Sequence, residues 1–276
     1  MEISATRGRT AVLGSLLALA LAGGACSPTG GGGSAADGQG SGAGVASAAD
    51  SAVAAWIRAA GGMEAWRDVG SLRYTVTTVW YDSTEAVRRM RPRRVEITKT
   101  PDGFMSRIER PEAEGLYVQA FTGDTIWATL NGHPLPPDHP AVEESEYVGR
   151  DVYYWIGLPY KLRDPGVNLD VSSAGPEGLE VRVTFGGDVG QHPGDQYFYR
   201  FLDGDPTPEE VHYVEQGTEG RTRTLWRDFR DAGPLTYVGT RRYVDASGRT
   251  TMELRIDDVW IDPPLPDSLF RPPTEG

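Results

Sequence analysis

The chain has 276 residues, a formal net charge of −12 and a single cysteine, Cys26. An acidic excess of this size disfavours nucleic acids and anionic lipid surfaces as partners. One cysteine cannot form an internal disulfide, so the folded part must be stable without such a crosslink.

Residues 1–25 have the composition of a secretory signal peptide. Arg7 and Arg9 precede an apolar stretch over 11–22, and small residues then lead to Cys26. The apolar stretch is shorter than the ~20 residues that a membrane-spanning helix needs. We therefore predict that this segment is a cleaved signal.

The end of the signal resembles the lipobox of bacterial lipoproteins, in which the cysteine is lipidated and becomes the new N-terminus. The lipobox prefers leucine three residues before the cysteine, whereas here Gly23 holds that place and Leu21 lies two residues earlier. The alternative is an ordinary signal that happens to end at a cysteine. The resemblance implies that Cys26 carries acyl chains that hold the protein on a membrane. Ser27, by the proteobacterial sorting rule, favours the outer membrane, facing the periplasm.

Residues 26–49 consist almost entirely of glycine, serine and alanine, with Asp37 as the charged exception. Such a composition buries too little apolar surface to fold and is typical of a flexible tether. The sequence therefore predicts a lipidated tether over 26–49 and one folded domain over 50–276.

The folded domain is predicted to begin with a helix over 51–60, for which Asp50 suits the N-cap. Its apolar residues recur at i, i+3, i+4 and i+7, which places them on one face. From Leu72 the apolar period changes to two, as in a half-buried strand. Turn sequences separate the strands that we predict next, over 72–80, 91–100, 104–110, 116–122 and 125–130.

An interior helix is predicted from Pro140, which suits the first helical position, to Ile156. Val148, Val152, Trp155 and Ile156 form an apolar stripe, so this helix should lie across the sheet. The remaining strands are predicted over 179–185, 195–202, 209–215, 223–229, 235–244 and 251–261.

These elements favour a mainly β (α+β) fold. About ten strands follow one another with too few helices to supply parallel crossovers. We therefore predict a single curved antiparallel sheet that forms an incomplete β-barrel and is covered by a few helices.

Several stretches resemble the LolA/LolB-like lipoprotein carrier and receptor superfamily. They lie over 56–72, 154–169, 188–195 and 266–270, and follow the lipobox-like signal. The likeness is greatest to uncharacterised bacterial lipoproteins related to that superfamily. The resemblance implies a half-barrel lidded by helices, with an apolar concave face able to hold acyl chains.

Motifs of known catalytic sites are absent from the predicted domain. It contains no G-x-S-x-G elbow, no phosphate-binding loop and no histidine pair with metal-ligand spacing. Asp188, His192 and Asp195 gather in a glycine-rich loop and could hold a metal, although such clusters are more typical of solvated turns. We predict no catalytic residue, no metal and no cofactor.

Aromatic residues are the remaining candidates for a binding site. Trp80, Trp127, Trp155, Trp226 and Trp260 fall on predicted strands or on the interior helix. Core packing is the simpler explanation for them, and lining of a ligand cavity is the functional one.

The sequence therefore predicts a membrane-anchored, non-enzymatic lipoprotein of the cell envelope. Its ligand would be apolar, such as an acyl chain, a lipid or a lipoprotein, bound in the concave sheet. Two alternatives stay open: an envelope hydrolase that uses the 188–195 loop, and a structural or adaptor lipoprotein whose core is filled by its own side chains.

Overall fold

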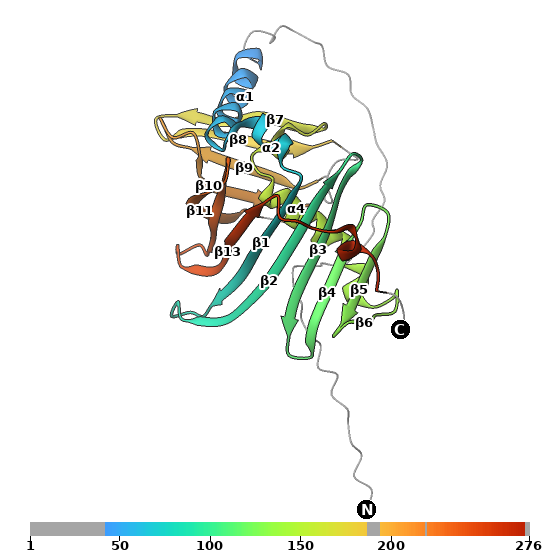
Figure 1. Ribbon diagram of the computed structural model, residues 1–276. Coiled ribbons are helices and arrows are strands. Elements are labelled where there is room, and N and C mark those ends of the chain that lie inside the picture. Colours follow the sequence, from blue (N-terminus) through green and yellow to red (C-terminus); the bar gives the residue numbers. More distant parts are fainter. Residues whose placement is uncertain (1–41, 187–193, 219, 274–276) are drawn as a thin grey trace, which may run out of the picture. The chain divides into compact units, whose positions relative to one another are not determined.

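The computed structural model describes residues 42–186, 194–218 and 220–273, all of which belong to the unit Gln39–Gly276. Within these ranges the chain forms one antiparallel sheet of thirteen strands, with four α-helices and two short 3-10 helices (Figure 1). The two outermost strands of the sheet do not pair with each other. The predicted fold class, a single open antiparallel sheet with a few helices, is therefore confirmed.

The strands follow the period-two pattern and the turns between them. They are β1 (Ser71–Tyr81), β2 (Val87–Thr100), β3 (Gly103–Glu112), β4 (Gly115–Phe121), β5 (Ile126–Leu130), β6 (His133–Pro134), β7 (Val167–Gly175), β8 (Gly178–Phe185), β9 (Gln196–Phe201), β10 (Pro208–Val214), β11 (Thr222–Ala232), β12 (Leu235–Val244) and β13 (Thr250–Ile261). The helices are α1 (Gly42–Ala59), α2 (Gly62–Asp68), α3 (Pro140–Glu143), α4 (Ser145–Ile156), η1 (Tyr160–Arg163) and η2 (Asp267–Phe270).

The order of the strands places β1 and β13 side by side in the middle of the sheet. From β1 the sheet extends through β2 to β6 on one side, and from β13 through β12 to β7 on the other. The segment that contains α3, α4 and η1 connects β6 at one edge with β7 at the other. It must therefore cross the width of the sheet, as we predicted for the interior helix.

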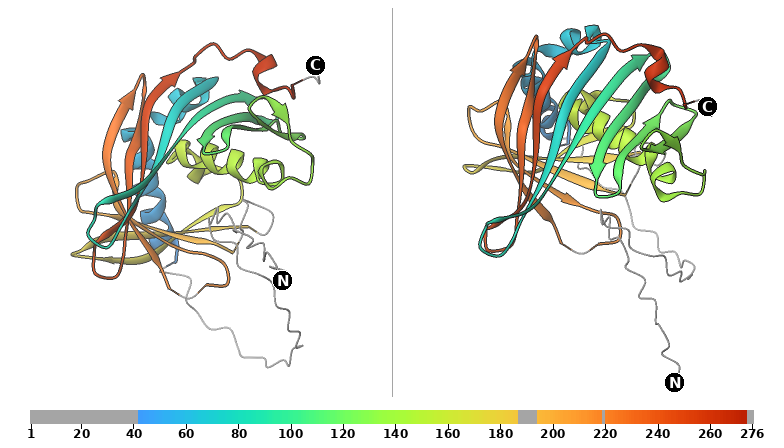
Figure 2. Two further views of the ribbon diagram at one scale, coloured as in Figure 1. Left: turned by 90° about the horizontal axis from the view of Figure 1, so that it is seen from below. Right: turned by 60° about the horizontal axis from the view of Figure 1, so that its bottom comes forward.

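The sheet curves around the helices, and Figure 2 shows α1 and α4 inside this curve. We call the side that faces them the concave face. Its core residues alternate along each strand, as with Leu72 and Tyr74 of β1 and Val95 and Ile97 of β2, which are all buried. They pack with the apolar sides of α1 and α4 in a single hydrophobic core.

Helix α1 begins earlier than the sequence predicted. It starts at Gly42, so Asp50 lies within the helix and the predicted N-cap there is wrong. The Asp50 carboxylate instead pairs with Arg163, whose Nη2 also donates to the Asp50 carbonyl at 2.9 Å. Four of the eight residues over 42–49 are alanine, which has the highest helix propensity. The helix thus occupies part of the segment predicted as a tether.

Two strands at the edges of the sheet were missed. Strand β7 carries Val167, Leu169 and Val171 on its inward positions, an alternation that was present in the sequence but was flanked by turn residues. Strand β6 has two residues and leaves no periodic signal. These edge strands show that short or turn-flanked segments depend on a neighbouring strand to adopt extended structure.

Candidate functional site

Helix α4 covers the concave face with aromatic side chains that point to both halves of the sheet. Tyr153 stacks on Phe104 of β3, with ring centroids 4.1 Å apart. Trp155 packs edge-on against Tyr197 of β9 at 5.7 Å and against Trp226 of β11 at 6.4 Å. Pairs of this geometry add stability beyond the area they bury. The aromatic residues of α4 therefore join strands that are far apart in the sheet.

Trp226 belongs to the largest aromatic cluster that we find in the described residues. Its side chain is 2% exposed. Its ring lies 5.8 Å from Trp56 of α1 and 5.8 Å from Tyr199 of β9, and its Nε1 donates to Thr224 Oγ1 at 3.1 Å. This cluster connects α1, α4 and the β9–β11 part of the sheet.

Polar contacts from the sheet hold the backbone of α4. The Tyr74 hydroxyl donates to the Val152 carbonyl at 2.9 Å, and Arg241 Nη2 donates to the Trp155 carbonyl at 2.7 Å. The Arg241 guanidinium also lies over the Trp155 ring, 4.5 Å from its centroid. Burial raises the pKa of Tyr74 well above its ordinary value and lowers that of Arg241. Both groups are thus deeply desolvated beneath the helix.

Four arginines occupy inward positions where apolar residues would be expected. Arg91 and Arg93 precede Val95 at intervals of two on β2, Arg110 follows Ile108 on β3, and Arg241 pairs with Leu254. We call Arg91, Arg93, Arg110 and Arg241 the inner arginine cluster. Burial lowers the pKa of Arg93, Arg110 and Arg241. Charged groups are therefore present on the face that also forms the core.

The hydrogen-bonding capacity of this cluster is incompletely used. In the part of the chain that the structure describes, the Nε atoms of all four arginines are buried without a hydrogen bond, as is Ser106 Oγ. Each unsatisfied buried group costs about 1–3 kcal/mol. The interface between α4 and the sheet is therefore less favourable than its aromatic contacts alone would make it.

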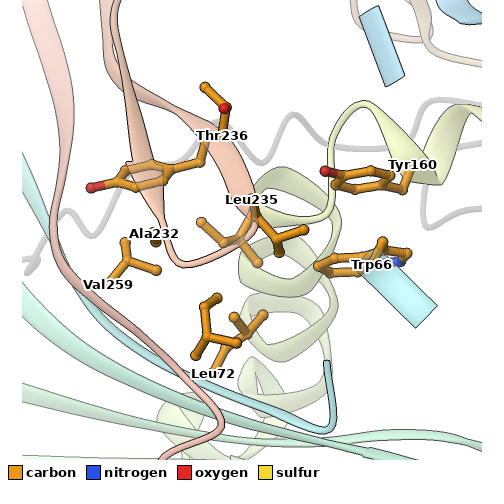
Figure 3. Close-up of a pocket in the computed structure, with 10 residues that line it drawn as sticks. Trp66, Leu72, Tyr160, Ala232, Leu235, Thr236 and Val259 are labelled. Atoms are coloured by element: carbon orange, nitrogen blue, oxygen red, sulfur yellow. The ribbon is translucent and has the colours of Figure 1, made fainter. Parts of the chain in front are cut away.

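Two small cavities flank α4. One, of about 30 Å³, lies between α4 and the middle of the sheet, and its lining residues are Tyr74, Val76, Arg93, Asp151, Val152, Trp155, Ile156, Arg241, Leu254 and Ile256. The other, of about 10 Å³, lies near α2, where Trp66 and Tyr160 face Ala232, Leu235 and Val259 (Figure 3). Ligand pockets usually have about 300–1,000 Å³. In this conformation α4 fills the concave face.

The structure brings together two of the five tryptophans proposed from the sequence. Trp155 and Trp226 are neighbours, and Trp155 lines the 30 Å³ cavity. Trp127 is half-buried on β5 and donates from Nε1 to the Phe270 carbonyl of η2 at 2.9 Å. Trp80 lies under the Arg89 guanidinium near the end of β1, and Trp260 is 60% exposed on β13. The last three therefore lie outside the α4 interface.

Sequence reasoning missed the polar members of this interface. Arg93, Arg241, Tyr74 and Asp151 all line the larger cavity, and Trp155 Nε1 donates to the Asp151 carboxylate at 2.7 Å. The signal for Arg93 was present, because it lies two residues before the apolar Val95 and so shares its face.

The loop with Asp188, His192 and Asp195, which was considered as a metal site and not predicted to be one, is described only in part. Asp188 and His192 lie outside the described residues, as does Cys26. Asp195 is buried, and its carboxylate accepts the backbone N–H of Gln216 at 2.8 Å, a contact that stabilises a loop. Across the described ranges, no three His, Cys, Asp or Glu side chains come close enough to form a metal site.

Among the helices of the described residues, none has the length and apolar character to span a bilayer.

No protein-family model matches the sequence, and no curated protein matches it either. Solved structures do match. A LolA superfamily protein from Nitrosomonas europaea has 12% sequence identity and a TM-score of 0.50, over 81% of this chain and 97% of that protein. A DUF1329 family protein from Desulfovibrio piger has 10% identity and a TM-score of 0.50, with the same coverage of both chains. These likenesses show the LolA-like fold that the sequence resemblance implied.

Proposed function

We propose that this protein is a membrane-anchored, non-enzymatic protein of the cell envelope that binds an apolar ligand on the concave face of its sheet. The ligand would be a lipid or the acyl chains of a lipoprotein. Affinity would come from burying methylene groups, at ~0.8 kcal/mol each, and would need no chemical step. The LolA-like fold supports this proposal, since the resemblance implies a concave face that holds acyl chains.

One observation carries the proposal: the interface between α4 and the concave face combines a large aromatic surface with buried polar atoms that lack hydrogen bonds. A core that stays closed usually satisfies its polar groups. An interface that opens can retain such groups, because they find partners in the open state. The arrangement therefore favours α4 as an element that leaves the concave face to admit a ligand.

The size of the cavities supports the same role for α4. About 30 Å³ accommodates a few water molecules and no acyl chain. A ligand on the concave face must therefore displace aromatic side chains that α4 packs there, which include Tyr153, Tyr154 and Trp155.

A disulfide between α4 and β3 tests this directly. Gly149 approaches β3 so closely that a Cβ there would overlap Ser106 Oγ and lie 3.0 Å from Phe121 Cβ. In the full chain carrying Cys26→Ser, the pair Ser106→Cys and Gly149→Cys would have the only two thiols, with Cβ atoms near enough to bridge. We expect oxidation to reduce the binding of an apolar fluorescent probe at least about tenfold, and reduction to restore it.

Two controls make the result decisive. The single Ser106→Cys variant should bind the probe equally well with and without oxidant. Equal binding by the oxidised and reduced forms of the double variant would show that the probe site does not lie beneath α4, and would overturn the role given to this helix.

The anchor is part of the same proposal. Lipidation of Cys26 would hold the folded unit at a membrane, and Ser27 favours the outer membrane, facing the periplasm. The expected result is an intact mass that includes acyl chains and a protein that partitions with membranes, both lost in Cys26→Ser. An unmodified thiol on the native chain would contradict the anchor without affecting the ligand site.

The small cavities also favour a second candidate, a structural or adaptor lipoprotein whose core stays filled. In that case the reduced double variant and the Cys26→Ser chain would both fail to bind apolar probes, and no lipid would co-purify in native mass spectrometry.

A further inference from the structure

The larger cavity beneath α4 carries an excess of positive charge. Two guanidinium groups, from Arg93 of β2 and Arg241 of β12, line it together with one carboxylate, that of Asp151 on α4. The carboxylate already accepts the Trp155 indole N–H at 2.7 Å. Buried charges are normally paired, so an excess of cationic groups at an apolar interface favours the binding of an anion there.

The unused donors of the two arginines are of the kind that bind oxyanions. Arg241 is 4% exposed, and its Nη2 donates to the Trp155 carbonyl while its Nε makes no hydrogen bond in the described ranges. Arg93 Nε is buried and unsatisfied in the same way. The Nε–H and a neighbouring Nη–H of a guanidinium form the fork that fits carboxylate or phosphate oxygens.

Further arginines extend the positive charge along the same face. Arg91 lies two residues from Arg93 on β2, and Arg110 faces the same side from β3. Glu112 forms ion pairs with both of these residues and offsets their charge in part. Arg93 and Arg241 share the carboxylate of Asp151, which lines the cavity with them, so each of the two arginine pairs exceeds its carboxylate by one positive charge. One of these two excess charges therefore lies at the cavity beneath α4.

We propose that Arg93 and Arg241 bind the oxyanion head group, a carboxylate or phosphate, of an amphiphile whose apolar chain replaces the aromatic side chains of α4. This inference rests on the proposed function and names its ligand class. When α4 leaves, Arg241 Nη2 loses the Trp155 carbonyl, and an oxyanion supplies a stronger acceptor in its place.

Paired ligands with the same chain test the head group. Oleate and oleyl alcohol would be titrated into the full chain carrying Cys26→Ser, by displacement of an apolar fluorescent probe, with inorganic phosphate alone as a third arm. We expect oleate to bind about tenfold more tightly than oleyl alcohol, as charge-assisted hydrogen bonds imply.

The test variant is Arg93→Gln, because Arg93 lines the cavity and its buried Nε makes no hydrogen bond in the described residues. Its matched control is Arg94→Gln, which removes the same charge from an exposed position on the opposite face, where Glu96 keeps Arg73 and Arg107 as partners. The expected result is loss of the preference for oleate in Arg93→Gln and its retention in Arg94→Gln.

The outcomes separate the two proposals. If the Cys26→Ser chain with Arg93 intact binds oleate and oleyl alcohol with equal affinity, the head-group site is overturned and the proposal of apolar binding is not affected. Failure of both amphiphiles to bind would overturn both proposals. Binding of inorganic phosphate alone, lost in Arg93→Gln, would support the oxyanion site and identify its source as a free anion.

Discussion

The two faces of the sheet use the same residue type, arginine, in opposite ways. On the convex face Glu96 is 2% exposed and accepts from three arginines, with Arg107 Nη1 at 2.9 Å and Arg73 Nε at 3.0 Å. On the concave face the inner arginine cluster leaves all four of its Nε atoms without a hydrogen bond in the described residues.

The convex pattern repeats along the sheet. Glu253 accepts from Arg242 Nε at 2.8 Å, from Arg255 Nη2 at 2.6 Å and from the Tyr81 hydroxyl at 2.8 Å. Each carboxylate there accepts from an arginine of a neighbouring strand and from an arginine two residues away on its own strand, so its charge is matched within the sheet itself. Cross-strand pairs of this kind stabilise a sheet.

The comparison distinguishes arginines that stabilise the sheet from arginines that we propose to bind a ligand. The arginines that pair with Glu96 and Glu253 have side chains that are 14–47% exposed, and each hydrogen-bonds to its glutamate. In the inner arginine cluster Arg241 is only 4% exposed, and all four Nε atoms are buried without a hydrogen bond in the described residues, which lowers the stability of that face. If the concave face binds a ligand as proposed, this loss of stability follows from keeping polar groups there that can bind it.

The largest expected effect is on the free energy of unfolding, when one tryptophan on each face is replaced by alanine. Trp226→Ala should lower the free energy of unfolding by about 3–5 kcal/mol, because it removes a buried side chain that packs against three other aromatic rings. Trp260→Ala should change it by less than about 1 kcal/mol, because that side chain is 60% exposed. Urea unfolding followed by circular dichroism measures both. Similar losses in the two variants would contradict the assignment of the core to the concave face.

An intermediate effect, dependent on pH, is expected on the convex face. The hydrogen bond from Arg223 Nε, at 2.7 Å, lowers the pKa of Glu210 to about 2 from its ordinary 4.5. A lowered pKa stabilises the folded state above pH 4.5, and this contribution is lost as the pH falls from 4.5 towards 2.

Glu210→Gln should therefore destabilise the protein by about 1–2 kcal/mol at pH 7, a value reduced by the solvent exposure of Arg223. The difference from the unmutated protein should shrink as the pH approaches 2. Unfolding curves at a series of pH values measure this difference. A difference that stays constant from pH 7 to pH 2 would show that the ion pair does not supply the stability.

The smallest expected effects have opposite signs on the two faces. Ser106→Ala on the concave face removes a buried hydroxyl that has no hydrogen bond in the described ranges, and should stabilise the protein by up to about 1 kcal/mol. Thr240→Val on the convex face breaks the 2.8 Å hydrogen bond to Asp228 and should cost about 1 kcal/mol. Thermal unfolding of the two variants measures both signs. Loss of stability in Ser106→Ala would indicate that Ser106 is satisfied.

Local pattern alone located most of the strands. The alternation over 235–244 predicted β12 with both of its ends, and the Gly123-Asp124 turn separated β4 from β5 as expected. Leu72 and Tyr74 were placed together on one face of β1, and both are buried. Period and turn chemistry act over a few residues, so a sequence expresses them directly.

The candidate site was predictable to a smaller extent. Trp155 and Trp226 were among the residues proposed from the sequence, and they do meet beneath α4. Arg93 and Arg241 were not proposed as site residues. Arginine side chains are usually exposed to solvent, so a buried arginine is not expected unless contacts with other segments are known.

The amino-acid sequence by itself determined three features of this protein. They are the order of most strands along the chain, the open antiparallel sheet and the apolar stripe of the interior helix. The tertiary structure decided that this helix crosses between the edges β6 and β7, that it fills the concave face, and that Arg93 and Arg241 line a cavity beneath it. The physical reason is that burial of a charged side chain depends on contacts between distant segments, such as Arg241 with Trp155, whereas strand and helix periods depend on neighbours in the chain.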